Sequence, residues 1–265
     1  MPELPEVETV VRSIAPITGQ RIVSAEFRNL RILRGGDPDR MSARLQGRRI
    51  AAVKRYGKFI VASLEGGGYL MIHLGMTGKL LLGGEPGKHT HAIFSFERGT
   101  LMFDDPRQFG CVELSEEFPP RVARLGPEPL EIPFEDFAAS LGKHKTRIKS
   151  LLLNQTFLRG VGNIYADEAL FRAGIHPLTL TRRIKRDRAR KLYDAIIAVL
   201  TEAIAAGGSS ISDYVDAEGR KGFFQISHRV YQRTGEPCTA CRAPIQRVIV
   251  TQRSSHFCPK CQKRS

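Results

Sequence analysis

The period of the hydrophobic positions divides the chain into two regions. Over residues 20–115 the apolar residues form short runs, and several runs alternate with polar positions, as strands of a half-buried sheet do. Glycines at 35–36, 66–68 and 83–84 supply turns between the runs. Many short strands with such turns indicate a sandwich or a barrel. Strands are predicted at 20–27, 49–56, 58–65, 69–75, 91–97, 100–104 and 109–114.

A helical period begins after the linker Gly126-Pro127-Glu128-Pro129-Leu130. It predicts helices at about 134–141, 146–154, 163–173 and 187–206. Between the second and third helices lies Gly160-Val161-Gly162-Asn163, whose glycines allow close backbone approach and whose asparagine is a good N-cap. Its amides suit a phosphate, but such turns also simply connect helices. Residues 209–235 are polar and have no clear period, which is typical of a mobile functional loop.

The N-terminal stretch predicts one more helix, at residues 5–16. Pro5 suits the first helical position, and Val7, Val10, Val11 and Ile14 share an apolar face that must dock on something. Docking would fix Pro2 and Glu3 just outside the positive end of the helix. Removal of Met1 would leave a secondary amine at Pro2, with a pKa of about 8. Such an amine is a nucleophile and Glu3 can move protons, although most chain termini are frayed and inert.

Four of the five cysteines form two Cys-x-x-Cys pairs near the C-terminus. Cys238 and Cys241, then Cys258 and Cys261, have the spacing of a four-thiolate zinc site, which has no open position and is therefore structural. The residues between the pairs predict a hairpin with Arg253 near its tip. His256 is then surplus as a ligand, and Cys111 is predicted to be a buried strand cysteine.

Charge changes the picture more than the other features of composition. The 265 residues contain 41 Lys+Arg and 27 Asp+Glu, a formal charge of +14, which favours nucleic acid or an anionic membrane as the partner. Residues 221–265 hold nine basic residues and one acid, and 143–149 and 182–186 are also basic. A solvated basic face is the alternative, but clustering favours contact with phosphates. No apolar run is long enough to span a bilayer and the N-terminus is not a secretory signal, so a soluble intracellular protein is expected.

These features together resemble the formamidopyrimidine-DNA glycosylase family. The resemblance covers essentially the whole chain and rests on ordered motifs and the four cysteines. The motifs are Pro2-Glu-Leu-Pro-Glu-Val-Glu-Thr9, Lys58 in Tyr-Gly-Lys-Phe, His73-Leu-Gly-Met-Thr-Gly78, Asp105-Pro-Arg-Gln-Phe-Gly110, Leu125-Gly-Pro-Glu-Pro-Leu130, Gly162-Asn-Ile-Tyr-Ala-Asp-Glu168 and Gly174-Ile-His-Pro177.

The resemblance implies an α+β fold in three parts. These are a catalytic β-sandwich with an N-terminal helix over residues 2–125, a helix-two-turn-helix domain over 126–235 and a zinc hairpin over 236–265. It also implies one structural Zn²⁺ per chain, a monomer, damaged double-stranded DNA as the partner, no membrane association, and a location in the bacterial cytoplasm at the nucleoid.

The implied activity is that of a bifunctional base-excision-repair enzyme, a hydrolase and a lyase, acting on 8-oxoguanine and ring-opened formamidopyrimidines. Pro2 matches the family's nucleophile, which attacks the sugar C1′ and forms a Schiff base that permits β- and then δ-elimination. Glu3 matches the residue that protonates the sugar ring oxygen. Glu6 matches a second acidic position near the site, and Lys58 a lysine that contacts phosphates flanking the lesion.

The resemblance assigns DNA contacts as well. Met76, Arg107 and Phe109 match side chains that fill the space left by a flipped nucleotide. The loop at about 213–224 matches the one that closes over the flipped base. Further DNA contacts are predicted for His91, Lys149, Asn163 and Arg253.

The chain departs from the family pattern at three positions. Gln108 stands where a second arginine is common, Arg159 replaces a small residue, and Gln232 stands where glycine is common. Gln108 leaves open how the base opposite the lesion is recognised. Two other functions also stay open. One is the sister activity on oxidised pyrimidines, against which the start Pro-Glu-Leu-Pro-Glu argues. The other is a non-catalytic lesion-binding protein, for which the pair Pro2 and Glu3 would not be required.

Overall fold

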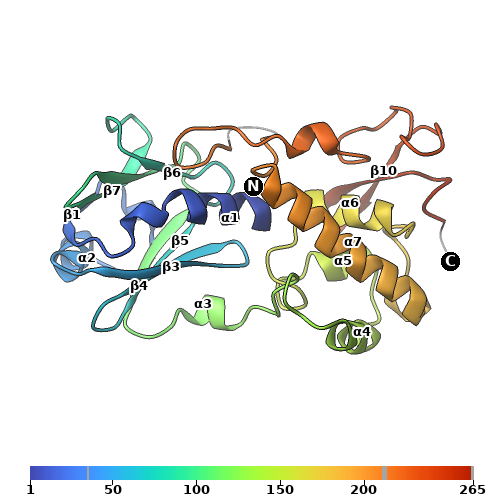
Figure 1. Ribbon diagram of the computed structural model, residues 1–265, viewed down its shortest axis with the longest axis horizontal. Coiled ribbons are helices and arrows are strands. Elements are labelled where there is room, and N and C mark those ends of the chain that lie inside the picture. Colours follow the sequence, from blue (N-terminus) through green and yellow to red (C-terminus); the bar gives the residue numbers. More distant parts are fainter. Residues whose placement is uncertain (35, 211–213, 264–265) are drawn as a thin grey trace. The chain divides into compact units, whose positions relative to one another are not determined.

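The computed structural model describes residues 1–34, 36–210 and 214–263, and the chain divides into two compact units (Figure 1). The first contains Met1–Arg124 and Ala206–Gln225, and the second contains Leu125–Ala205 and Ile226–Ser265. The division at residues 124–125 lies one residue from the predicted boundary. Ala206–Gln225, however, which the predicted boundaries place in the helical domain, pack with the N-terminal unit.

Two sheets form the frame of the first unit. The five-stranded sheet has the order β2-β9-β5-β4-β3, and the four-stranded sheet has the order β1-β7-β8-β6. All neighbours are antiparallel except β2 and β9. The strands are β1 (Ile22–Phe27), β2 (Leu33–Arg34), β3 (Ile50–Tyr56), β4 (Phe59–Leu64), β5 (Tyr69–His73), β6 (Lys79–Leu82), β7 (Thr90–Phe96), β8 (Thr100–Asp104) and β9 (Cys111–Ser115).

One continuous hydrophobic core joins these sheets. It contains Ile22, Phe94 and Phe103 from the four-stranded sheet and Ile72 and Val112 from the five-stranded sheet, all 3% exposed or less. Each predicted strand has an observed counterpart, while the short β2 and β6 were not predicted. The predicted β-sandwich is confirmed.

Helix α1 (Leu4–Ser13) belongs to the same core. Val7, Val10 and Ile14, from the predicted apolar face, are at most 1% exposed. The α-helix ends earlier than predicted because Pro16 has no backbone N–H and disfavours the helical conformation of the residue before it. The 3₁₀ turn Ala15–Ile17 follows. Two other helices of this unit, α2 (Pro38–Leu45) and α3 (Pro120–Ala123), were not predicted.

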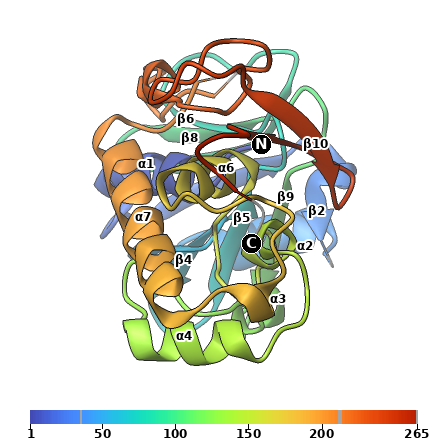
Figure 2. The ribbon, with the colours of Figure 1, turned by 90° about the vertical axis from the view of Figure 1, so that its right-hand side faces the viewer.

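The second unit is helical, with a β-hairpin near its C-terminal end (Figure 2). Its helices are α4 (Phe134–Gly142), α5 (Ile148–Leu152), α6 (Asn163–Arg172) and α7 (Arg186–Ala205), and the hairpin strands are β10 (Gln246–Val250) and β11 (Arg253–Phe257). Helix α5 is shorter than predicted because Arg147 pairs with Leu180 in a β-bridge before the helix begins. Helix α7 crosses the unit on the left of Figure 2, and the hairpin lies at the upper right. The predicted α+β class is confirmed.

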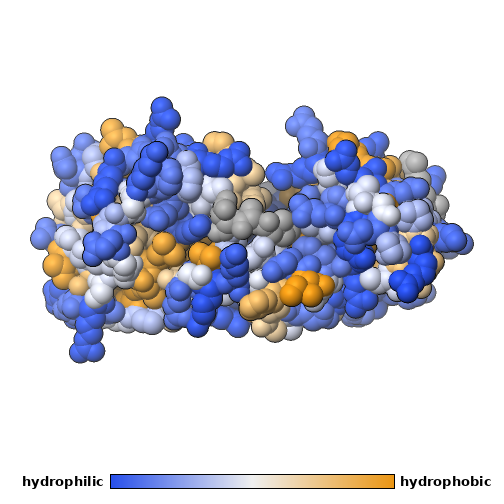
Figure 3. Space-filling model, turned by 90° about the horizontal axis from the view of Figure 1, so that it is seen from above, coloured by the Kyte–Doolittle hydropathy of each residue, from blue (hydrophilic) through white to orange (hydrophobic). Residues whose placement is uncertain are grey.

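None of the described helices combines the length and the apolar character needed to cross a lipid bilayer. On the face seen in Figure 3, patches of hydrophobic side chains interrupt a mainly hydrophilic surface.

Candidate functional site

The start of the chain is buried and anchored by one carboxylate. Pro2 is buried, and Glu3 and Glu6 are 3% and 2% exposed. The backbone N–H of Glu3 donates to Oε2 of Glu6 at 2.8 Å, half of a capping box at the start of α1. The other oxygen, Oε1, accepts the N–H of Ser209 at 2.7 Å. Glu6 therefore joins the first residues of the chain to the segment that follows α7.

That segment, Ala206–Gln225, packs closely on α1 because it carries glycines at the contact. Gly208 has a φ of +81°, and a Cβ there would lie 2.7 Å from Oε1 of Glu6. A Cβ on Gly222 would lie 2.3 Å from the carbonyl oxygen of Gly208. The Tyr214 hydroxyl donates to the carbonyl of Glu6 at 3.1 Å. Within the predicted base-covering loop, Tyr214 is thus tied to the N-terminal helix, while Asp213 lies outside the described residues.

Lys58 lies in the turn between β3 and β4 and is 8% exposed. Helix α1 is tied to the same strand pair, because Arg55 of β3 donates to Glu8 at 2.8 Å. Burial opposes ionisation of Glu8, but hydrogen bonds from Arg55 and Arg12 outweigh it and hold the pKa of that carboxyl below its ordinary value. The N-terminal residues and the Lys58 turn are thus positioned by elements that an ion pair connects.

Two adjacent loops carry the side chains predicted to fill the space that a flipped nucleotide leaves in the DNA. Met76 is 41% exposed and Phe109 54%, unusually high for large apolar side chains. The Arg107 guanidinium stacks over the Phe109 ring, 4.6 Å from its centroid. Gly75 allows the loops to approach, since a Cβ there would lie 2.5 Å from the backbone of Phe109. The structure therefore brings the three predicted residues onto neighbouring loops of one unit.

The buried carboxylate of Asp105 organises both loops. Asp105 is 0% exposed and accepts the N–H groups of Gly110 at 2.7 Å and Arg107 at 3.2 Å, together with the Thr77 hydroxyl. His91 supports the same residue from β7, since its Nε2 lies 2.9 Å from the Asp105 carbonyl oxygen. At 6% exposure, His91 presents little surface, and the DNA contact predicted for it stays a prediction.

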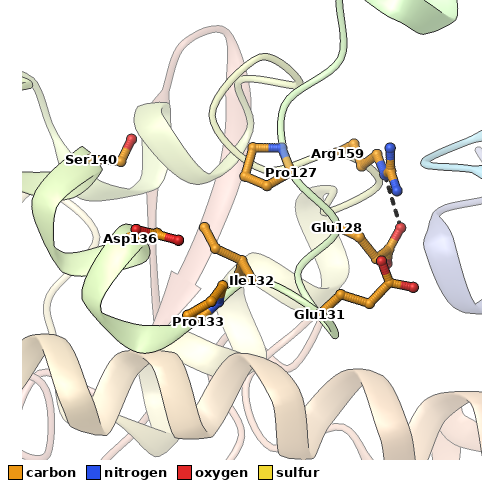
Figure 4. Close-up of a pocket in the computed structure, with 8 residues that line it drawn as sticks. All are labelled: Pro127, Glu128, Glu131, Ile132, Pro133, Asp136, Ser140 and Arg159. Carbon is orange, nitrogen blue, oxygen red and sulfur yellow. Dashed lines mark hydrogen bonds and ion pairs between the residues drawn. The ribbon is translucent and has the colours of Figure 1, made fainter.

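The departures from the family pattern have structural settings. Gln108 and Gln232 have φ values of +56° and +60°, in the left-handed region that favours glycine. Arg159 donates to the nearly buried Glu128 at 3.0 Å. This pair borders a cavity of about 510 Å³ that Glu131 and Asp136 also line (Figure 4). Three carboxylates against one arginine make this cavity unsuited to a phosphate backbone.

The four predicted cysteine ligands lie together in the second unit. The Sγ atoms of Cys238, Cys241, Cys258 and Cys261 are all within 4.8 Å of one another, with separations of 3.9 Å between Cys238 and Cys261 and 3.3 Å between Cys241 and Cys258. Four sulfurs at a Zn–S distance of about 2.3 Å are roughly 3.8 Å apart in a tetrahedron, so the cluster fits Zn²⁺. Amide N–H groups of Ala240 and Cys261 point at Sγ of Cys238 and Cys258, as they do at thiolates.

Arg253 is exposed in this unit, whereas Asn163 is half-buried. Arg253 is the exposed first residue of β11, directly after the two-residue turn Thr251-Gln252. Asn163 begins α6 rather than capping it, because the N-cap is Gly162. Its Oδ1 is buried without a hydrogen-bond partner among the described residues.

Lys149 differs from its prediction. It is 0% exposed, and its ammonium is paired with Asp167, whose side chain is also 0% exposed. A buried ammonium held by a carboxylate does not reach a phosphate in this arrangement. The expectation of a direct phosphate contact is corrected accordingly: Lys149 is an interior residue.

Sequence reasoning missed the roles of three carboxylates. Asp105, Asp167 and Glu168 are all at most 1% exposed. Glu168 accepts the amides of residues 229–231, although burial raises the pKa of its carboxyl. Each stands in a motif quoted for the family resemblance, but no sequence period distinguishes a buried organising carboxylate from an exposed one.

The chain matches three family models along its length. Residues 1–112 match the formamidopyrimidine-DNA glycosylase N-terminal domain, 125–215 the formamidopyrimidine-DNA glycosylase H2TH domain, and 235–264 a zinc finger found in FPG and IleRS.

Full-length relatives agree. The chain is 81% identical to a formamidopyrimidine-DNA glycosylase from Solibacter usitatus over 264 residues, covering 100% of both. It is similar to the crystal structure of the MutM (Fpg) protein from Thermus thermophilus, with 44% identity, a TM-score of 0.90 and 100% of both chains covered. A mutant of the Lactococcus lactis Fpg protein in complex with DNA containing Fapy-dG has 37% identity and a TM-score of 0.91, with 99% of this chain and 100% of that one covered.

The half-buried imidazole of His73, on β5, predicts a dependence of stability on pH. Burial, followed by the charges of Arg121 and Lys58, lowers the pKa of His73 to about 4. Between pH 6.5 and 4 the unfolded chain therefore binds the proton more readily, so the free energy of unfolding should fall as pH falls through this window. The His73 contribution is at most about 3 kcal/mol.

Denaturant unfolding from pH 7 to pH 4 measures this effect. His73→Gln should reduce the slope with pH, whereas His89→Gln, at an exposed position, should not. Equal slopes in wild type and His73→Gln would contradict the assignment.

Proposed function

The chain belongs to the formamidopyrimidine-DNA glycosylase family, and we propose that it excises oxidised purines from duplex DNA with the amine of Pro2 as its nucleophile. The observation that carries this proposal is the anchoring of the chain start by Glu6. A free chain end samples many positions, whereas a nucleophile must be held close to its target carbon. Burial of Pro2 and Glu3 in one unit supplies that order.

In the first chemical step the Pro2 nitrogen replaces the damaged base on C1′ of the sugar. The Pro2 nitrogen forms a bond to C1′ as the glycosidic bond breaks, and the base leaves with a proton. Glu3, next to Pro2 in sequence, protonates the ring oxygen of the sugar and assists opening. The product is an iminium ion between Pro2 and C1′ of the open sugar.

Strand cleavage follows from the same intermediate. The iminium ion withdraws electrons and acidifies the C2′ proton; its loss expels the 3′ phosphate by β-elimination, and a second elimination expels the 5′ phosphate. Lys58, on the turn that the Arg55–Glu8 ion pair connects to α1, is assigned to a phosphate flanking the lesion. No step requires the zinc ion.

Access to C1′ requires the damaged nucleotide to leave the duplex, because a protein terminus cannot reach C1′ inside the base stack. Exposed apolar side chains that wedge into the stack are the common means of filling the resulting space. Met76 and Phe109, with Arg107 stacked on the latter, have the exposure that this role needs. The segment at 214–224 would then cover the flipped base.

The second unit is assigned contacts with the phosphate backbone of DNA. Arg253 at the hairpin tip and Asn163 at the start of α6 are assigned to phosphates, which gives affinity without sequence preference. The four cysteines would hold a structural Zn²⁺ that fixes the hairpin. We place the enzyme, as a monomer, in the cytoplasm with chromosomal DNA.

Incision assays distinguish this activity from two others. Action on oxidised pyrimidines would use the same nucleophile, so only the preferred substrate distinguishes it. An enzyme specific for oxidised purines should incise a duplex with an oxidised pyrimidine more slowly than one with 8-oxoguanine. A non-catalytic lesion-binding protein would bind both duplexes and incise neither.

Borohydride trapping tests the proposed function. Incubated with a duplex containing one 8-oxoguanine, the protein should incise the damaged strand, and borohydride should convert the iminium ion into a stable covalent adduct. Pro2→Gly should lose incision by at least about a hundredfold, since it lacks the constrained secondary amine. A chain that retains Met1 should also be inactive, because its Pro2 nitrogen is an amide. Normal cleavage by Pro2→Gly would contradict the nucleophile assignment.

Loss of the Asp105 carboxylate should disorder the two loops that carry Met76 and Phe109. Asp105→Ala leaves the N–H groups of Arg107 and Gly110 without their acceptor, so Met76 and Phe109 should lose their fixed positions. Affinity for a lesion duplex should fall about tenfold or more, with a smaller loss for undamaged DNA, as measured by fluorescence anisotropy. Asp39→Asn, an exposed change in the same unit, is the control. An equal loss for both duplexes would argue against a wedge.

Removal of the metal should weaken DNA binding. A chelator that extracts zinc leaves four thiols where the hairpin needs a crosslink, so the tip carrying Arg253 should lose its place. Affinity should fall at least about tenfold, and added Zn²⁺ should restore it. Unchanged affinity in protein shown to be metal-free would contradict the proposal that the hairpin binds DNA.

A further inference from the structure

We propose that Asp167 is a positioning residue. It sets the distance between Asn163 and Arg253, the two residues of the second unit that are assigned to DNA phosphates. This inference rests on the proposed function, since it deepens the role given to Arg253. Asp167 lies on α6, is 1% exposed, and does not reach the surface itself. Its effect on DNA must therefore pass through the residues that it holds.

The Asp167 carboxylate binds consecutive residues of β11. Oδ1 accepts the hydroxyl of Ser255 at 2.9 Å and pairs with the Lys149 ammonium. Oδ2 accepts the backbone N–H of His256 at 2.9 Å and lies 3.2 Å from its Nδ1. One side chain of α6 thus fixes both a side chain and the backbone of the hairpin strand.

Helix α5 adds two contacts closer to the hairpin tip. The Lys149 ammonium lies 3.5 Å from the carbonyl oxygen of Ser254, and the hydroxyls of Ser150 and Thr251 are 2.8 Å apart. The turn residue and three residues of β11 are therefore tied to α5 or α6. Arg253 is enclosed in sequence by these anchored positions.

The geometry of the two elements relates Asp167 to both proposed contacts. Asn163 precedes Asp167 by four residues, so the two lie on the same face of α6, one turn apart. Arg253 precedes Ser255 by two residues, so they share a face of β11 roughly 7 Å apart along the strand. A single buried carboxylate, one turn from the start of α6, therefore binds β11 two residues from Arg253. A change at Asp167 should alter the distance between Asn163 and Arg253.

Zinc alone does not fix this distance. Of its four ligands, Cys258 is the one closest in sequence to Arg253, and it follows the end of β11. The strand can pivot about that end unless something holds it nearer the tip. The buried Lys149–Asp167 ion pair stabilises the fold only if its geometry is good, because both charges lose their hydration. Such a pair is better suited to specifying one arrangement than to adding stability.

A double-mutant cycle on the zinc-loaded full chain tests the proposal. Affinity is measured for a duplex carrying an uncleavable tetrahydrofuran abasic analogue, over a range of salt concentrations. Arg253→Ala should weaken binding about tenfold or more and reduce the salt slope by about one. Asp167→Asn should weaken binding severalfold with a similar change of slope. The double variant should bind no more weakly than Arg253→Ala, because the effect of Asp167 passes through Arg253.

Additive losses in the cycle would overturn the proposal, since a residue that acts only on general stability weakens binding whether or not Arg253 is present. No effect of Arg253→Ala would overturn it in a different way, by removing the phosphate contact on which it rests. Asp136→Asn removes the same charge from an exposed place in the same unit and should leave both affinity and slope unchanged.

The design also separates positioning from unfolding. Zinc content and melting temperature are measured for each variant. If Asp167→Asn does not fold, Ser255→Ala replaces it in the cycle, because it removes one hydrogen bond and no charge. At saturating enzyme, the single-turnover rate of base excision should stay within about twofold of wild type, since Pro2 belongs to the other unit. A rate that falls as much as affinity would contradict a role confined to Arg253.

Discussion

The Glu6 carboxylate anchors the start of the chain, and the order of the proposed site depends on it. Its two oxygens accept the N–H of Glu3 and the N–H of Ser209, so one side chain orders both the proposed nucleophile's neighbour and the segment that would cover the flipped base. The hydrophobic face of α1 places this carboxylate, because Val7 and Val10 bury completely in the core of the sandwich. Glu6 thus has a structural role at the start of the chain, in addition to the catalytic role predicted for it.

Buried carboxylates recur as organisers where exposed residues must be presented. Asp105 holds the loops of Met76 and Phe109, and Asp167 holds the strand that begins with Arg253. In each case the buried acid accepts backbone N–H groups, which fixes the loop or strand at an atom that substitutions of the neighbouring side chains do not remove. Buried negative charge therefore orders the segments that carry these exposed side chains.

The sequence predicted the elements with a strong period and missed those with a weak one. The alternating strands and the valine face of α1 were predictable because burial on one side imposes a repeat. Helix α2 buries only Met41 and Leu45, and β6 is four residues long, so neither has enough repeats to be recognised. Cysteine spacing identified the metal cluster. Lys149 was misplaced because it stands in a basic run, and only tertiary packing against Asp167 takes it into the interior.

In the proposed mechanism the ordered chain start, and no lysine, attacks the sugar. The most direct measurement is the position of the adduct after borohydride trapping, followed by digestion with trypsin and mass spectrometry. We expect a modified peptide running from Pro2 to Arg12, with the sugar remnant on the Pro2 nitrogen. An adduct on Lys58 or any other lysine, with the Pro2 peptide unmodified, would contradict it.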